Sequence, residues 1–492
     1  MPENSGYKGS FLKYLTQQRK LLLIASIIFV AIFLLLKLCF PLPDFFNDSF
    51  TYLYDAVNKP DISYRPLGYS NFLSIIHIIS TNGNFAVFIQ YLLFFISTLF
   101  CFFSCDYLYG FPPKLRLVVF YLALINPILI FQTNLISSDS LFCSLTVTWF
   151  TLCLWIIKRN TYPLLLLQAA LLLVCFHVRY TAIFYPAVAA IVFLFSKGRM
   201  LYKVVGIILS ITVVYFYVER QKAISEDHFN IRVFSGFSGW QMANNVLCYY
   251  KKIDVDPKDL PDLDTRNIDR LVKKFIDKMY VEDYVGTQYM WDKNSPLKLY
   301  VYVRETDRQK SYFSQWYSAS KPLGDYGWAI IKRNPLAYVR YFIIPNTKNY
   351  FLPDQEALSN YNYYSLKISP DTKDWFGYDF ERLYCRFPDL QQNIMFLYPE
   401  ISFALNVFNI VIVCVCLFRY FVARKKTDRD GRTLFLVWCT FYFGFMALCL
   451  FSTIVLLRYL DPLFALGIIV PFLLLHQIKK TLAPTPDQEK TV

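Results

Sequence analysis

Long runs of apolar residues recur along this chain, and they limit the folds open to it more than any other feature. The first run extends from Leu21 to Phe40 and contains no acidic residue. In hydrocarbon every backbone amide must be hydrogen-bonded within its own segment, so a run of about 20 apolar residues crosses a bilayer as a helix. The chain of 492 residues is 55% apolar and only 17% charged, which is too apolar for a soluble globule. The sequence therefore predicts an all-α polytopic membrane protein.

We count about ten runs of spanning length. The predicted spans are residues 21–40, 84–105, 115–133, 138–157, 162–177, 180–196, 204–218, 397–420, 433–456 and 460–478. No small-residue cleavage site accompanies the first run, so we interpret it as a retained first helix and not as a signal peptide.

Basic residues gather in the short links on one side of the predicted helices. They are Lys114 and Arg116, Lys158 and Arg159, Lys197, Arg199 and Lys203, the cluster from Arg424 to Arg432, and Lys479 and Lys480. Alternation from a cytoplasmic N-terminus places all of them inside, as the positive-inside rule requires. The net charge of +14 therefore needs no nucleic-acid partner, and the expected partners include membrane lipids.

The same pattern divides the chain into predicted domains. Residues 219–396 are charged and rich in Tyr and Trp, and they contain no run of spanning length. Helical spacing after an Asp or Thr start at 264–280, and Asn334 before Pro335 as a cap and first-turn pair, favour a largely helical domain. The predicted parts are a transmembrane catalytic module at 1–218 with an acidic external loop at 41–83, an extracytoplasmic domain at 219–396, transmembrane helices at 397–480 and a cytoplasmic tail at 481–492.

The polar residues that are candidates for catalysis or binding share the predicted outer side. The loop after the first span carries Asp44, Asp48 and Arg65, and the same side holds Asp139 and Arg458. A transferase with a nucleotide-sugar donor would need a cytoplasmic nucleotide-binding domain, for which the cytoplasmic links are too short. An activated donor on the outer face is instead expected to be linked to a lipid phosphate. Its phosphate leaves as an anion, so the site needs cations near it and one carboxylate to take a proton from the acceptor.

Five short motifs resemble a known family. Asp48-Ser-Phe-Thr-Tyr52, followed by Arg65-Pro-Leu-Gly-Tyr69, resembles the D-[ES]-x-x-Y and R-P-P-G-Y pattern of the GT-C glycosyltransferases. The branch is that of the protein O-mannosyltransferases and lipid A aminoarabinose transferase, which is glycosyltransferase family 39-like. Ser137 to Phe142, Val178 to Thr181 and Leu457 to Pro462 are similar to its second acidic, Arg-bearing and R-Y-L-x-P motifs.

The resemblance covers the first 218 residues and the last helices, and residues 219–396 do not align with it. The chain departs from the pattern at Leu67, where a second proline is usual, and at Ser49, where Glu is common. These departures leave the subfamily and any metal role open. A divalent ion is optional in such folds, and with no cluster of metal ligands at suitable spacing we assign none.

The resemblance implies roles for three carboxylates. Asp48 would be the general base of an inverting displacement, with Asp139 orienting it or the sugar hydroxyls. Asp44 is the substitute base, and a pair of carboxylates sharing the work stays open. The alternatives for Asp48 are a solvated loop carboxylate or the cap of the helix that follows. The alternative for Asp139 is a place at a helix start, where capping and the helix dipole favour a carboxylate.

Arginines and tyrosines complete the candidate site. Arg65, Arg179 and Arg458 would bind the lipid phosphate, because a guanidinium holds phosphate in a bidentate manner. Their alternative is snorkelling to lipid headgroups. Tyr52 and Tyr69 would stack on a sugar face, although aromatic residues also crowd membrane interfaces without any ligand.

The interpretation that follows is an integral membrane inverting glycosyltransferase. It would move a sugar from a polyprenyl-phosphate donor to a lipid, glycan or protein acceptor on the extracytoplasmic face, in the bacterial inner membrane. The alternatives are a surface-glycan polymerase or ligase that uses a lipid diphosphate oligosaccharide, a transporter or flippase, and a non-catalytic assembly subunit. Few charges lie within the predicted helices, which is less typical of transporters.

Most of the twelve cysteines lie in apolar runs and are expected to behave as small hydrophobes. Cys248 and Cys385 fall well outside these runs. In an oxidising compartment the two could form a disulfide across the predicted external domain.

Overall fold

A computed structural model describes residues 10–279, 286–304, 311–365, 367–419 and 429–480. In these ranges the chain is helical, and its β-structure is limited to three isolated bridges. The tail at 481–492 and part of the Arg424 to Arg432 cluster lie outside the described residues.

Eight helical stretches of the described chain are long and apolar enough to cross a membrane. They are α2 (Arg19–Cys39), α5 (Gly83–Tyr109), α6 and α7 (Pro113–Leu124 and Pro127–Asn134), α8 (Ser138–Lys158), α11 (Met200–Phe229), α21 and α22 (Leu390–Met395 and Tyr398–Leu417), α23 (Arg429–Ser452), and η9 with α24 (Leu457–Leu460 and Asp461–Lys480). The two other predicted spans are the shorter apolar helices α9 (Tyr162–Val178) and η1 with α10 (Tyr180–Phe184 and Tyr185–Phe195). The prediction of an all-α, multi-pass membrane protein is confirmed.

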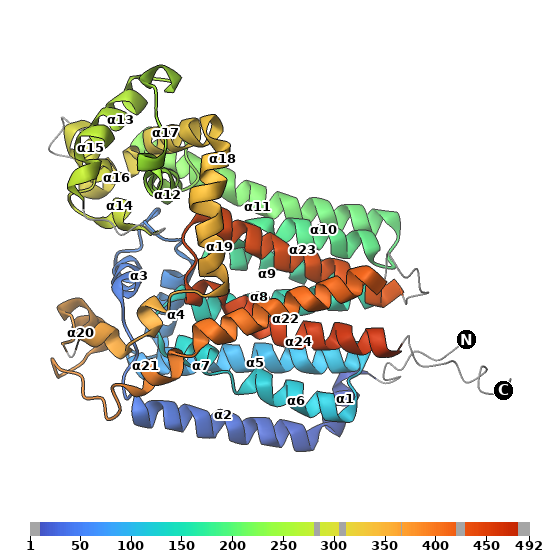
Figure 1. The fold of residues 1–492 in the computed structure, drawn as a ribbon. Coiled ribbons are helices and arrows are strands. Elements are labelled where there is room, and N and C mark those ends of the chain that lie inside the picture. The colour runs from blue at the N-terminus through green and yellow to red at the C-terminus, as the bar shows by residue number, and fades with distance from the viewer. Residues whose placement is uncertain (1–9, 280–285, 305–310, 366, 420–428, 481–492) are drawn as a thin grey trace.

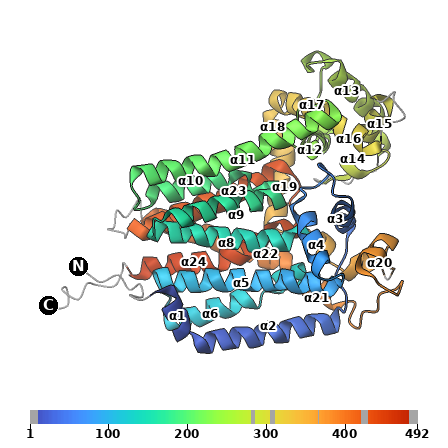
Figure 2. The same cartoon turned by 180° about the vertical axis from the view of Figure 1, so that it is seen from behind.

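These helices form one bundle (Figure 1). At its centre α8 packs against α5, α9, α10 and α24. In both views α2 runs along one edge, with α10 and α11 along the opposite edge (Figure 2). Because α8 is enclosed, its polar side chains such as Ser140, Thr146 and Thr151 are buried together with its apolar ones.

The remaining helices gather at one end of the bundle, which we call the loop end and define as residues 40–82, 179, 230–279, 286–304, 311–365, 367–396 and 453–460. Helix α1 (Phe11–Gln17) and the last turns of α24 lie at the opposite end (Figure 1). The helices of the loop end are α3 (Asn47–Asn58), α4 (Gly68–Ile79), α12 (Gly236–Leu247), α13 (Leu263–Phe275), α14 (Gln288–Trp291), α15 (Pro296–Arg304), α16 (Tyr312–Ser318), α17 (Ser320–Arg333), α18 (Pro335–Tyr338), α19 (Ile344–Phe351) and α20 (Pro370–Phe376).

Two hydrophobic cores hold the molecule together. The larger joins the bundle to residues 350–398, and the smaller joins residues 240–342 around Trp240 and Trp316, whose rings stack at 5.3 Å. Helix α11 runs without a break through the predicted boundary at 218/219. Residues 219–396 thus contribute to both cores, and their boundaries as an independent domain stay a prediction.

Two local predictions concern the Asn334 cap and a disulfide between Cys248 and Cys385. Asn334 is the N-cap residue of α18 and Pro335 lies in its first turn, as predicted. The Asn334 side chain makes no capping hydrogen bond, because its Nδ2 donates to the Ile330 carbonyl at 3.4 Å. Cys248 and Cys385 are free thiols. Cys248 donates to the carbonyl of Gly286 at 3.5 Å and Cys385 to that of Cys39 at 3.3 Å, so they lie in different surroundings.

Candidate active site

The first loop is fastened to the segment that leads into α8. Asp44 N donates to the Asn134 carbonyl, and Ile136 N donates to the Asp44 carbonyl, both at 2.9 Å, which makes a parallel bridge. The Ser49 hydroxyl donates to the Ile136 carbonyl at 2.7 Å. These bonds set the first turn of α3 beside the first turn of α8, and those turns carry Asp48 and Asp139.

Arg458 lies between these two carboxylates. Its Nη2 donates to Asp48 Oδ2 and its Nη1 to Asp139 Oδ2, each at 3.2 Å. The guanidinium carbon sits 4.8 Å from the ring centre of Phe46, and its side chain is 5% exposed. A buried guanidinium of this kind needs carboxylate partners on more than one edge, and the two aspartates supply them.

Two further arginines, Arg65 and Arg179, pair with the same two aspartates. Arg65 Nη2 donates to Asp48 Oδ1 at 2.6 Å, and Arg179 forms an ion pair with Asp139. We call Asp48, Arg65, Asp139, Arg179 and Arg458 the Arg–Asp cluster. These five predicted site residues come from four segments of the chain, and the structure brings all of them together.

The members of the Arg–Asp cluster differ in their access to solvent. The side chain of Asp139 is fully enclosed, whereas that of Asp48 is 12% exposed. The side chains of Arg65 and Arg179 are 21% and 19% exposed. A ligand that approaches from the loop end can therefore reach Asp48 and the two outer arginines, while Arg458 and Asp139 form the floor.

The charge state of Asp48 follows from its neighbours. Burial alone would raise the pKa of this carboxyl, but the positive charges of Arg65, Arg458 and Arg179 outweigh burial and hold the pKa below its usual value. Asp48 is therefore ionised at neutral pH and can accept a proton or a hydrogen bond.

Glu356 is a member of the site that sequence reasoning missed. Its Oε2 accepts from Arg458 Nε at 2.7 Å, and its side chain is 33% exposed. Leu457 N donates to the Asp354 carbonyl at 2.8 Å, which ties the segment before Glu356 to the segment before Arg458. No sequence signal marks Glu356, because it lies in the region that does not align with the family.

Asp44 has other partners. Its Oδ1 accepts from the backbone N–H of Asn362 at 2.6 Å and its Oδ2 from Gln391 Nε2 at 3.2 Å. Burial raises the pKa of Asp44 to about 7, although both of these hydrogen bonds lower it. Its carboxyl therefore joins the first loop to two distant segments of the loop end.

The two tyrosines lie beneath the site. Tyr52 and Tyr69 meet edge to face at 4.9 Å and are buried. The Tyr52 hydroxyl shares a hydrogen bond of 2.9 Å with Ser138 Oγ, and the Tyr69 hydroxyl donates to Gln90 Oε1 at 2.5 Å. Neither ring is open to a ligand in this structure, so both pack α3 and α4 against the bundle.

Neither aspartate of the Arg–Asp cluster is a helix cap. The cap position of α3 is Phe46, and that of α8 is Ser137, whose hydroxyl accepts from Asp139 N at 3.3 Å. Capping is therefore wrong for both, although each carboxylate lies in the first turn of its helix, where the helix dipole favours it. Their carboxylates are free to face the arginines because other residues occupy the cap positions.

The cluster does not have the character of a cation site. Among the described residues no group of three His, Cys, Asp or Glu side chains lies close enough to hold a metal ion. The oxygens of Asp48 and Asp139 face guanidiniums, which already supply the positive charge that a divalent ion would bring.

Comparisons with known proteins find little similarity to this chain. No protein-family model matches the sequence, and a search of curated proteins finds no match. One similar solved structure is the crystal structure of the Archaeoglobus fulgidus oligosaccharyltransferase in the apo form, which is 14% identical with a TM-score of 0.34. The match covers 96% of this chain and 52% of that one, so this chain spans about half its length. A similarity of this size leaves fold and function to be argued from the helices and the site.

Proposed function

We propose that this protein is an integral membrane glycosyltransferase of the GT-C type, which transfers a sugar from a polyprenyl-phosphate donor with inversion. The observation that carries the proposal is the position of Arg458 between Asp48 and Asp139, with Arg65 and Arg179 at the accessible edge. The motif resemblance supports the same assignment, because all five residues belong to its motifs.

The arrangement suits a displacement at the sugar's anomeric carbon. The acceptor hydroxyl attacks that carbon on the face opposite the phosphate, and Asp48 takes its proton. The bond from carbon to phosphate oxygen breaks, and its electron pair stays on the phosphate. Arg65 and Arg179 bind the departing anion, since guanidiniums placed where charge develops lower the barrier. Arg458 and Asp139 hold Asp48 and the two outer arginines in position. After transfer, the proton on Asp48 passes to water.

The distribution of charge supports an extracytoplasmic site. Lys114 and Arg116 begin α6, and Lys158 and Arg159 end α8, at the end of the bundle opposite the loop end. Positive residues favour the cytoplasmic side, so the Arg–Asp cluster would face outward. The setting that the resemblance implies is the bacterial inner membrane, with residues 219–396 as a lid or a reader of a lipid, glycan or protein acceptor.

The test uses cells that lack the gene and are complemented with variants. Mass spectrometry of surface glycans and lipids should show one sugar lost in the deletion strain and restored by the wild-type protein. Asp48→Asn should fail to restore it at equal expression, because the amide cannot take the proton. Asp44→Asn is the matched control and should restore it.

Restoration by Asp48→Asn would contradict the assigned base. If only Asp44→Asn failed to restore the sugar, Asp44 and not Asp48 would be the general base. Accumulation of a whole lipid-linked oligosaccharide in the deletion strain would favour the polymerase or ligase alternative.

A further inference from the structure

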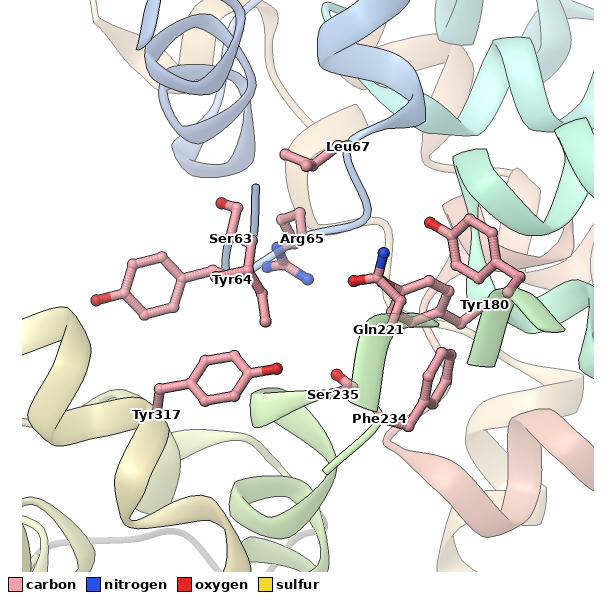
Figure 3. A pocket seen from close by; sticks show the side chains of 11 residues that line it. Ser63, Tyr64, Arg65, Leu67, Tyr180, Gln221, Phe234, Ser235 and Tyr317 are labelled. Atoms are coloured by element: carbon pink, nitrogen blue, oxygen red, sulfur yellow. The ribbon is translucent and has the colours of Figure 1, made fainter. Parts of the chain in front are cut away.

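Two openings in the described part of the protein differ greatly in size. The opening beside Arg65, which Gln221 and Tyr317 also line, has a volume of about 10 Å³, enough for about one water molecule (Figure 3). The second, which we call the α3–α20 pocket, has a volume of about 500 Å³. Ligand sites run from about 300 to 1,000 Å³. A small organic molecule therefore fits the α3–α20 pocket and not the opening at Arg65.

The α3–α20 pocket lies between three helices of the loop end. Its lining includes Tyr54 and Val57 of α3, His77 of α4, and Asp371, Asp374 and Trp375 of α20. Val57 stands nine residues after Asp48, which is roughly 14 Å along the axis of α3. The pocket therefore opens toward the far end of α3 and is a second site, separate from the Arg–Asp cluster.

Ring contacts hold the walls of the pocket in place. The imidazole of His77 stacks on the indole of Trp375, with ring centres 3.9 Å apart, which joins α4 to α20. The next residue, Phe376, is buried and lies 5.9 Å from the ring of Phe45 in the first loop. The pocket is thus formed before a ligand enters, and binding needs little further ordering of these side chains.

Two carboxylates supply the charge of the pocket. Asp371, Asp374 and Trp375 stand at i, i+3 and i+4, which places them on one face of α20. Neither aspartate forms an ion pair within the described residues, and the described lining contains no Lys or Arg. The helix dipole favours Asp371 in the first turn of α20, but it disfavours Asp374 in the last turn. Helix stability therefore does not account for Asp374.

An organic cation matches both the carboxylates and the rings. An ammonium group is attracted to carboxylates and to the faces of Trp and Tyr. Tyr54 is 65% exposed and Trp375 is partly exposed, so a ligand can reach them. A metal ion would need more oxygen ligands, and among the described residues no group of three metal-binding side chains occurs. An anion would be repelled by both aspartates.

We propose that the α3–α20 pocket binds an organic ammonium ion, with Asp371 and Asp374 paired to its charge and the aromatic walls against its apolar part. This inference goes beyond the proposed function, because the pocket includes no member of the Arg–Asp cluster. The ammonium group belongs to a soluble amine or to the headgroup of an aminophospholipid, since both present the chemistry that the pocket recognises.

The test measures binding of 2-phenylethylamine, which is protonated at neutral pH, to the full-length protein in detergent by saturation-transfer difference NMR. The amine should bind saturably, with a Kd on the order of millimolar. Its uncharged analogue 2-phenylethanol should bind about tenfold more weakly, and so should the amine to the double variant Asp371→Asn with Asp374→Asn. Asp227→Asn with Asp254→Asn makes the same change in charge at two exposed positions outside the pocket and should bind as the wild type does.

Further measurements separate the two sources of the ammonium group and the two sites. Displacement of the amine by short-chain phosphatidylethanolamine alone assigns the pocket to a lipid headgroup, and no displacement assigns it to a soluble amine. Asp48→Asn should bind the amine as the wild type does, whatever its effect on transfer. Displacement by phosphatidylglycerol, equal binding of the amine and 2-phenylethanol, equal binding by the Asp371 and Asp374 double variant, or no saturable binding by the wild-type protein would each overturn the proposal.

Discussion

At the scale of single residues, Arg458 pairs with three carboxylates at once, which a lysine in its place could not do. Its Nη1, Nη2 and Nε each reach a different carboxylate, on Asp139, Asp48 and Glu356. The planar guanidinium presents these donors in a fixed fork, whereas a lysine ammonium is a single compact charge. The R-Y-L motif thus holds the two aspartates at a defined separation and orientation.

Asp44 gives a prediction about stability and pH. Its pKa of about 7 means that the folded protein holds this proton more tightly than the unfolded chain, in which Asp titrates near 3.9. The free energy of unfolding should therefore fall as pH rises from about 4 to about 7, by up to about 4 kcal/mol from this group, and stay level above. Asp44→Asn should remove this part of the slope, as measured by thermal unfolding in detergent across that pH range.

The control for this experiment is Asp61→Asn, since Asp61 is highly exposed in the same loop. It should leave the slope unchanged. An identical slope in Asp44→Asn and the wild type would show that Asp44 is not the group responsible.

Sequence reasoning found single residues where a motif marks them. Asp48, Asp139 and the three arginines stand in motifs at helix ends, and the structure brings them into one cluster. It did not find Glu356, because that residue meets Arg458 only through tertiary structure. The positions of Tyr52 and Tyr69 do not support the stacking role, because both rings are buried. The sequence could not show this, since a tyrosine near a membrane interface looks the same in the sequence whether its ring is buried or open to a ligand.

At the scale of elements, the cluster depends on how closely α4 approaches the end of α9. A Cβ built on Gly68 would lie 2.5 Å from the carbonyl oxygen of His177 and 2.7 Å from Val178 N, both backbone atoms. The next residue, Arg179, ends α9 and pairs with Asp139. The glycine of the R-P-L-G-Y motif therefore allows the first loop to meet the segment that carries Arg179.

Gly68→Ala should separate these two elements. Backbone atoms cannot yield as a flexible side chain can, so we expect a loss of stability of about 1–3 kcal/mol. Transfer in complemented cells should also fall, because Arg179 would move with the end of α9. Thermal unfolding in detergent and the glycan assay measure the two effects.

Gly467→Ala is the control, because the atom nearest its added Cβ is a side-chain nitrogen of Asn409 at 3.2 Å. A loss in Gly68→Ala no greater than in this control would contradict the packing argument.

Elements were predictable where hydrophobicity alone decides them. The ten predicted spans are mainly helical in the described residues, since a helix satisfies its own backbone groups in a membrane. The span 115–133 is interrupted between Leu124 and Pro127, and the span 433–456 is helical only as far as Ser452. Their ends were less predictable. Helix α11 continues to Phe229, well past the predicted end at 218, because its later turns pack on protein at the loop end and not in lipid. Asn334 occupies the N-cap position of α18 as predicted, but its side chain bonds back to α17, which runs up to Arg333, and so makes no capping hydrogen bond.

At the scale of the whole molecule, contacts between distant segments build the site. Asn362 bonds to Asp44, and the Tyr398 hydroxyl accepts from Ile128 N at 3.0 Å. Residues 350–398 consequently share the core of the bundle. A single sequence cannot reveal such contacts, because hydrophobic patterning marks which residues are buried and not which segments they meet. For the same reason the external domain at 219–396 stays a prediction.

The central claim is that the Arg–Asp cluster binds a lipid-borne phosphate, and native mass spectrometry of gently purified protein tests it most directly. The wild-type protein should retain a polyprenyl monophosphate, alone or with one sugar. Arg65→Gln should lose most of this lipid, since the side chain of Arg65 is partly exposed at the edge of the site and its guanidinium would bind the phosphate. Arg159→Gln, at the opposite end of the bundle, should retain it. Absence of any isoprenoid from the wild-type protein while the donor is abundant in the membrane, or equal retention by Arg65→Gln, would contradict the account.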